Sequence, residues 1–93
     1  MSSIKYKNNN LFVENTSVKK LALKYKSPFY LYSNSNISKN FKSFYDNFKK
    51  INPLICFSVK ANSNIKILRI LKKLGSGADV VSGGELLKAL KSG

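Results

Sequence analysis

The chain has 93 residues, which is short for a folded domain, and 43% of them are hydrophobic, which is too many for a disordered chain. No stretch approaches about 20 consecutive apolar residues, so no membrane span is predicted. The N-terminal residues lack an apolar signal region, and we therefore expect a protein of the cytoplasm.

The net charge of +13 suggests a polyanionic partner at first sight. Arg69, however, is the only arginine among the seventeen basic residues, and arginine is the residue preferred for bidentate contacts with bases and phosphates. The lysines fit solvated helix faces. We therefore predict no nucleic-acid and no membrane partner, although a small basic nucleic-acid-binding protein stays open as an alternative.

The single cysteine, Cys56, and the absence of histidine limit the possible chemistry. One cysteine without histidine excludes an intramolecular disulfide, a typical zinc site and a Cys–His nucleophile. Cys56 lies within an apolar run, where we expect a small core residue. The sequence predicts no metal site.

The first third of the chain alternates short apolar runs with turn residues. Residues 4–14 predict a strand, a turn rich in asparagine and a second strand. A helix is expected over 18–25, with Thr16 or Ser17 as its N-cap. The aromatic run 29–32 predicts another strand.

An amphipathic helix follows, with Ser35 or Asn36 as its expected cap. Its apolar residues fall on one helical face, which favours a core stripe over a platform on which bases stack. These residues are Ile37, Phe41, Phe44, Tyr45, Phe48 and Ile51.

Residues 54–64 contain the most informative stretch of the chain. A short apolar run, typical of a buried strand, leads directly into Lys60. The carboxyl ends of parallel strands are where chemistry is found in barrels and open sheets, and a desolvated lysine can lose its proton and attack a carbonyl group. With sixteen lysines in the chain, a chance position at a strand end is the competing interpretation.

The remaining residues predict a strand–helix–strand–helix order. Asn64 can cap a helix that ends at Gly75, residues 78–81 form a second buried strand, and Ser82 starts another helix. This rhythm is typical of a parallel sheet with βαβ crossovers. Parallel strands need several neighbours, so we expect the chain to be a fragment of something longer.

Strand alternation assigns faces to the side chains. Cys56, Ser58 and Lys60 would share the smaller, more polar face, while their neighbours meet the helices. Asp79 in the second strand would point to the same side, where a carboxylate could tune the pKa of a lysine; a solvent-facing strand residue is the alternative. Glu85 completes an S-x-x-E capping box, which gives it a structural task.

Two motifs, residues 58–64 (SVKANSN) and residues 77–86 (GADVVSGGEL), give the sequence a specific resemblance. Together with residues 27–32 (SPFYLY), they resemble the N-terminal part of the diaminopimelate decarboxylases, fold-type III enzymes of the alanine-racemase-like group. The resemblance covers roughly residues 27–93. Ser58 departs from it, because the family usually has alanine there.

The resemblance implies roles for three residues and a cofactor. Lys60 would be the catalytic lysine that binds pyridoxal 5'-phosphate covalently and later helps to protonate the substrate carbon. Asp79 would lie close to Lys60 and the cofactor. Glu85 would be a second acid at the mouth of the active site.

The resemblance also implies a fold and an assembly. Residues 34–93 would begin a pyridoxal-phosphate-binding (β/α)₈ TIM barrel with about two βα units, and residues 1–33 would belong with a β-sandwich domain. The full-length enzyme would be a homodimer acting on a small amino acid, and the 93 residues alone would be inactive.

The expected reaction is the decarboxylation of meso-2,6-diaminopimelate to L-lysine and carbon dioxide, the last step of lysine biosynthesis. A related decarboxylase of the same fold that acts on ornithine, arginine or carboxynorspermidine is the first alternative. A non-catalytic pyridoxal-phosphate carrier is another.

Overall fold

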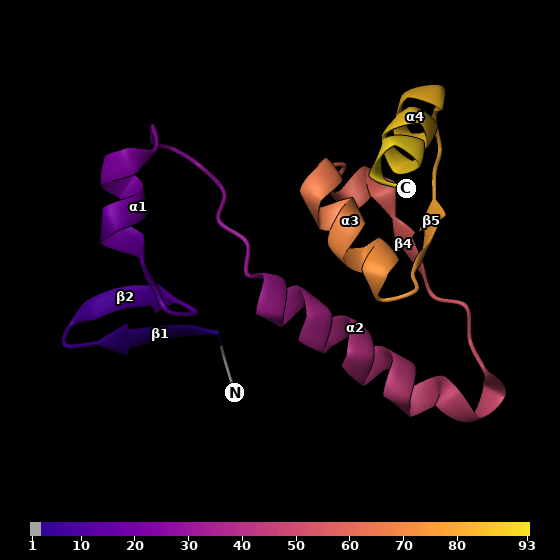
Figure 1. The fold of residues 1–93 in the computed structure, drawn as a ribbon, viewed down its shortest axis with the longest axis horizontal. Coiled ribbons are helices and arrows are strands. Elements are labelled where there is room, and N and C mark those ends of the chain that lie inside the picture. The colour runs from indigo at the N-terminus through magenta and orange to yellow at the C-terminus, as the bar shows by residue number, and fades with distance from the viewer. Residues whose placement is uncertain (1–2) are drawn as a thin grey trace. The chain divides into compact units, whose positions relative to one another are not determined.

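The computed structural model describes residues 3–93, and these residues form two compact units, residues 3–36 and 37–93 (Figure 1). The first unit is a small antiparallel sheet with one helix, and the second is a helical layer on two parallel strands. Within the described residues, no helix has both the length and the apolar character needed to cross a membrane.

The sheet of the first unit contains β1 (Ile4–Lys7), β2 (Asn10–Val13) and β3 (Thr16–Ser17) in that order. The turn between β1 and β2 places Asn8 and Asn9 at positive φ angles of 52° and 65°. Asparagine tolerates this left-handed region, and two such residues make the tight turn that suits a twisted hairpin. The predicted strand–turn–strand over residues 4–14 is confirmed.

The helix α1 (Val18–Lys24) follows directly on β3. Its N-cap is Ser17, the second of the two expected candidates, whose Oγ accepts a hydrogen bond from the backbone N–H of Lys20 at 3.4 Å. The strand predicted over residues 29–32 is wrong, because these residues pair with no strand among those the structure describes. Aromatic residues favour strands, but a strand exists only where a partner supplies hydrogen bonds.

The helix α2 (Asn34–Phe48) begins earlier than predicted and runs into the 3₁₀ turn η1 (Lys49–Ile51). Ser33, which is buried, provides the capping oxygen in place of Ser35 or Asn36, and its Oγ accepts from the backbone N–H of Asn36 at 3.1 Å. The apolar stripe of α2 is only half covered. Ile37, Phe41 and Tyr45 are partly buried, whereas Phe44, Phe48 and Ile51 are exposed.

The rest of the second unit follows the predicted strand–helix–strand–helix order. It contains β4 (Cys56–Ser58), the 3₁₀ turn η2 (Val59–Ala61), α3 (Ile65–Lys73), β5 (Gly77–Asp79) and α4 (Gly83–Ser92). β4 and β5 are parallel and pair Cys56 with Gly77, Phe57 with Ala78, and Ser58 with Asp79. The fold is therefore mixed α/β, and its two parallel strands do not close a barrel.

Local chemistry fixes both ends of α3. The Oδ1 of Asn64 accepts from the backbone N–H of Lys66 at 2.9 Å, so the predicted N-cap is confirmed. At the other end Gly75, at φ 93°, donates to the carbonyl of Lys72 at 2.9 Å, and Ser76 donates to the carbonyl of Leu71 at 3.0 Å. This pair of hydrogen bonds is a Schellman motif, whose left-handed position suits glycine.

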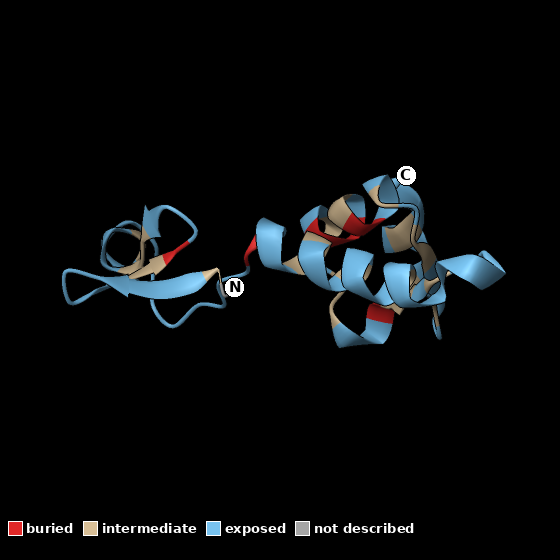
Figure 2. Cartoon of the chain, turned by 90° about the horizontal axis from the view of Figure 1, so that it is seen from below, coloured by how far each residue is buried: buried red, intermediate tan, exposed pale blue. Residues whose placement is uncertain are grey.

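The core of the second unit lies between α3, α4 and the strands. Its buried apolar residues are Val59, Ile67, Leu68 and Leu71. Buried parts of the chain are red in Figure 2. Cys56 is exposed, so its predicted place in the core is wrong. Its side chain alternates with that of Phe57, which points to the helix side, and it therefore lies on the other face of β4.

Candidate functional site

Lys60 lies in the turn η2, two residues beyond the last residue of β4. The strand is shorter than predicted: it ends at Ser58, and the following residues wind into a single 3₁₀ turn that closes with a hydrogen bond of 3.1 Å from the N–H of Asn62 to the carbonyl of Val59. The alternation of faces expected from Cys56 to Lys60 therefore stops at Ser58. Lys60 still leaves the carboxyl end of the strand, with an exposed side chain.

Val59 anchors this turn. Its exposed fraction is 0%, which makes it the one fully buried large side chain of the part of the chain that the structure describes. The turn that carries Val59 contacts α4. Because a fully buried valine holds its own backbone in place, it limits the movement of Lys60, the next residue in the chain.

Short polar links hold the segment that follows Lys60. The Oδ1 of Asn62 accepts from the backbone N–H of Asn64 at 3.0 Å, and Asn64 in turn caps α3. The Oγ of Ser63 accepts a hydrogen bond of 3.1 Å from the Nζ of Lys88 on α4. These bonds tie the lysine-bearing turn to two different helices.

Asp79 is the last residue of β5, and its Cα pairs with that of Ser58. Residues that pair across parallel strands project to the same face of the sheet, so the carboxylate shares the face of Ser58. The Asp79 side chain is exposed and forms no hydrogen bond or ion pair with any residue that the structure describes. The register therefore brings Asp79 to the same end of the sheet as Lys60.

Glu85 lies in the first turn of α4 and takes part in capping. Its backbone N–H donates to the Oγ of Ser82 at 3.1 Å, and its Oε1 accepts from the backbone N–H of Val81 at 3.1 Å. The Ser82 half of the predicted capping box is confirmed, whereas the carboxylate accepts from the N–H of Val81 and not from that of the cap residue Ser82. One carboxylate oxygen of Glu85 is thereby engaged in structure.

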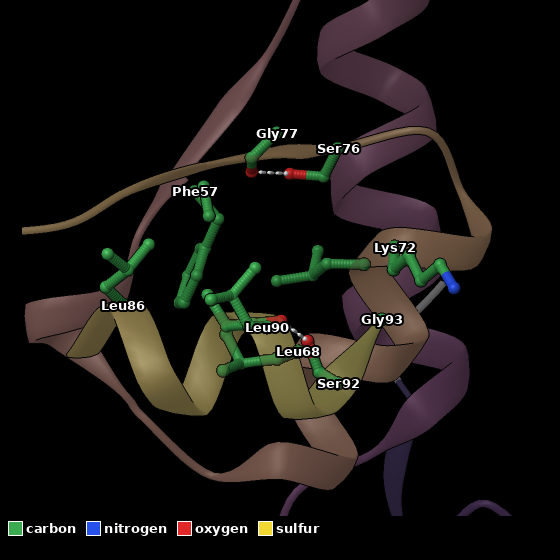
Figure 3. Close-up of a pocket in the computed structure, with 12 residues that line it drawn as sticks. Phe57, Leu68, Lys72, Ser76, Gly77, Leu86, Leu90, Ser92 and Gly93 are labelled. Carbon is green, nitrogen blue, oxygen red and sulfur yellow. Dashed lines mark hydrogen bonds between the residues drawn. The ribbon is translucent and has the colours of Figure 1, made fainter. Parts of the chain in front are cut away.

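A cavity of about 300 Å³ lies on the opposite, helix side of the strands (Figure 3). The ring of Phe57 and the side chains of Leu68, Leu86 and Leu90 point into it. None of the three predicted site residues lines this cavity. Its mainly apolar lining marks it as a gap in the packing of α3 and α4 against the strands.

The carboxyl end of the sheet combines an amine with a carboxylate. The Nζ of Lys60 has no hydrogen-bond or ion-pair partner among residues 3–93, so it is free to react with an aldehyde or to hold an anion. The carboxylate of Asp79 can stabilise a nearby positive charge or orient a ligand nitrogen. Within residues 3–93, no group of three or more metal-ligating side chains could hold a metal ion. The donor set suits an organic cofactor with an aldehyde group.

Two features around Lys60 are not predicted by the sequence patterns: the bond between Ser63 and Lys88, and the turn η2. The bond between Ser63 and Lys88 joins residues 25 positions apart, and only the spacing of Lys88, one helical turn after Glu85, could have suggested that it faces the same end of the sheet. The burial of Val59 was expected from strand alternation. The turn that it anchors was not.

The family is shown by a sequence match over residues 34–93, which fits the model "Pyridoxal-dependent decarboxylase, pyridoxal binding domain". The chain belongs to this family of pyridoxal-dependent decarboxylases, whose cofactor is pyridoxal phosphate. The amine at the carboxyl end of β4 agrees with this membership.

Within that class, the chain is similar to several diaminopimelate decarboxylases. The enzyme of Pseudomonas fluorescens is 39% identical and that of Haemophilus influenzae 42% identical, each over the whole chain. A solved diaminopimelate decarboxylase from M. jannaschii, in co-complex with L-lysine, superimposes with a TM-score of 0.90 at 36% identity over 99% of the chain. The chain spans about a fifth of the length of these relatives, 22% for both curated enzymes and 23% for the solved structure.

Proposed function

We propose that the protein carrying this chain decarboxylates meso-2,6-diaminopimelate to L-lysine and carbon dioxide with pyridoxal 5'-phosphate as its cofactor. The family membership supports the cofactor and the reaction class. The substrate rests on the relatives, which are diaminopimelate decarboxylases, one of them crystallised with L-lysine. L-lysine is the product that this reaction would release.

The observation that carries the proposal is the register of the parallel strands. Ser58 pairs with Asp79, so the carboxylate stands at the same sheet end from which Lys60 emerges two residues later. An amine and a carboxylate at the carboxyl ends of adjacent parallel strands have the placement that chemistry takes in βα folds. The exposed Lys60 and Asp79 side chains both remain available to a ligand there.

Each residue has a distinct task in this proposal. Lys60 would hold the cofactor through its Nζ, and the same Nζ would deliver a proton to the substrate carbon. When bound, the cofactor supplies the electron sink that decarboxylation requires. Asp79 orients the cofactor and the lysine through its negative charge, and Glu85 contributes a second acid at the mouth of the site.

The proposal extends to the fold and the assembly. Residues 34–93 are the start of a (β/α)₈ barrel in which β4 and β5 are the first two strands, and residues 1–33 belong with a β-sandwich domain. The active enzyme is a homodimer in the cytoplasm. The β4–β5 sheet has two open edges among the described residues, which supports the barrel, because parallel strands are normally flanked on both sides.

A chemical trapping experiment tests the proposal. The native protein is purified from its source, reduced with borohydride and analysed by mass spectrometry, both intact and as peptides. We expect a phosphopyridoxyl group on the peptide that contains Lys60, and carbon dioxide release from meso-diaminopimelate. An unmodified Lys60 would contradict the cofactor role.

The substrate is tested separately from the cofactor. The purified protein is offered meso-diaminopimelate, ornithine, arginine and carboxynorspermidine at equal concentrations, and carbon dioxide release is compared as kcat/KM. We expect meso-diaminopimelate to be preferred. If Lys60 is labelled but the protein prefers another amino acid, the reaction class would stand and the proposed substrate would be wrong.

A further inference from the structure

The lysine-bearing turn is connected to α4 by one side-chain hydrogen bond. The Nζ of Lys88 donates to the Oγ of Ser63 at 3.1 Å, across 25 positions of sequence. Ser63 lies three residues after Lys60, and Lys88 lies three residues after Glu85, in the second turn of α4. The bond therefore joins the segment that presents the amine to the helix that presents the second acid.

We propose that Lys88 is a positioning residue for Lys60, acting through Ser63. This inference rests on the proposed function, because it assigns Lys88 a part in presenting the Lys60 amine to the cofactor. Lys88 does not itself react. Its ammonium group holds the Ser63 hydroxyl, and the backbone between Ser63 and the turn η2 transmits that constraint to Lys60.

The surroundings of the turn explain why this contact has an effect. On the side before Lys60, the backbone is fixed by the fully buried Val59. On the side after it, Asn62 fixes the N–H of Asn64, but this bond lies within the same segment and holds it to neither β5 nor α4. The Lys88–Ser63 bond is the hydrogen bond that ties the downstream side to α4. Without it, the Lys60 backbone keeps its anchor at Val59 and its link to α3 through Asn64, but loses the hydrogen bond that holds it to α4.

The positive charge of Lys88 affects the strength of its hydrogen bond to Ser63 and so guides the choice of replacement residues. An ammonium donor makes a stronger hydrogen bond to a hydroxyl than a neutral amide does. An arginine can donate in the same direction, whereas a methionine fills similar space without a donor. These differences supply the variants for the test.

The test uses the whole protein that carries this chain, with Lys88→Met, Lys88→Arg, Ser63→Ala and the double variant Lys88→Met with Ser63→Ala. Lys91→Met is the matched control, since Lys91 is an exposed lysine one turn further along the same helix. Three quantities are measured: kcat and KM, the absorption spectrum of the bound cofactor, and hydrogen exchange of residues 60–64 in the cofactor-free protein.

We expect Lys88→Met and Ser63→Ala each to lower kcat about threefold to tenfold, the scale on which one solvent-exposed hydrogen bond acts, with little change in KM. Both should speed exchange over residues 60–64 by a similar factor. The double variant should be no worse than either single variant, because both remove the same bond. Lys88→Arg should recover most of the rate, and Lys91→Met should match the wild type.

Two results would overturn the inference while leaving the proposed function intact. The first is a Lys88→Met protein in which Lys60 still binds the cofactor and in which kcat, the cofactor spectrum and the hydrogen exchange of residues 60–64 are unchanged. The other is a set of losses that multiply in the double variant, which would show two independent effects. A wild-type protein whose Lys60 is never labelled by borohydride would overturn the proposed function and this inference together.

Discussion

The sulfur of Cys56 occupies the space that a side chain at Gly77 would need. An ideal Cβ at Gly77 would lie 2.7 Å from the Sγ of Cys56, closer than real Cβ atoms come to other heavy atoms. The two residues are paired across the parallel strands β4 and β5. The absence of a side chain at Gly77 thus permits this thiol to lie over β5 at the start of the strand pair.

Gly77→Ala should lower the free energy of unfolding by about 1 kcal/mol, because the Cys56 thiol must leave its rotamer or the strands must separate. In a Cys56→Ala background the sign should reverse, since alanine suits a strand better than glycine once the sulfur is gone. Urea unfolding followed by circular dichroism measures both. Equal effects in the two backgrounds would contradict the contact.

Gly75→Ala should cost about 1–2 kcal/mol of unfolding free energy, because φ is 93° and an L side chain is strained there. Gly75→Asn should lose less, as asparagine tolerates the left-handed region. Gly83→Ala is the control: no atom lies within 4 Å of its ideal Cβ, and the residue begins α4, so it should be neutral or slightly stabilising. A comparable loss at both glycines would refute the role of the Schellman motif.

Lys60→Arg should abolish covalent attachment of the cofactor and reduce kcat by about a thousandfold or more, because a guanidinium keeps its protons and cannot act as the nucleophile. The positive charge is retained, so a loss of charge cannot explain the result. Lys73→Arg, in the last turn of α3, should leave activity and cofactor content unchanged. Cofactor absorbance and carbon dioxide release are the measurements.

Asp79→Asn should lower kcat by about a hundredfold, the scale on which a misplaced reacting group affects rate, while the fold is kept. The side chain is exposed, so its replacement by a neutral isostere leaves no buried group unpaired. Asp46→Asn, an exposed carboxylate on α2, serves as the control with expected wild-type kcat. An Asp79→Asn enzyme as active as the control would remove Asp79 from the site.

Glu85→Gln separates the two tasks assigned to Glu85. The amide oxygen of glutamine can still accept the hydrogen bond from the N–H of Val81, so the free energy of unfolding should change by less than about 0.5 kcal/mol. The kcat should nevertheless fall if the acid takes part at the mouth of the site. Glu85→Ala, which also removes the cap, should lose stability as well. An unchanged kcat in Glu85→Gln would leave Glu85 with capping alone.

The parts of the fold that could be predicted are those determined by neighbouring residues. The hairpin of β1 and β2, the Asn64 cap, the glycine at the end of α3 and the capping box at Ser82 all depend on hydrogen bonds within a few positions of sequence. The order of elements from β4 onward could also be predicted, because the hydrophobic residues repeat every second residue in a strand and about every 3.6 residues in a helix.

The parts that could not be predicted depend on partners distant in sequence. Residues 29–32 have strand-forming side chains, but whether they pair is decided by another strand. The sequence pattern predicts a strand with alternating faces as far as Lys60. In the structure the strand ends at Ser58, and Val59 is buried within the turn η2. The bond between Ser63 and Lys88 likewise joins residues 25 positions apart, so it depends on how α4 packs.

The position of Val59 has a consequence for how this sequence can change over time. A side chain with no exposed surface is joined by one peptide bond to the residue proposed to carry the chemistry. Replacement of Val59 by a smaller or larger residue would shift the reactive amine at the same moment as it altered the packing. Selection for turnover should therefore hold the volume at position 59 nearly constant, even where selection for stability alone would tolerate drift.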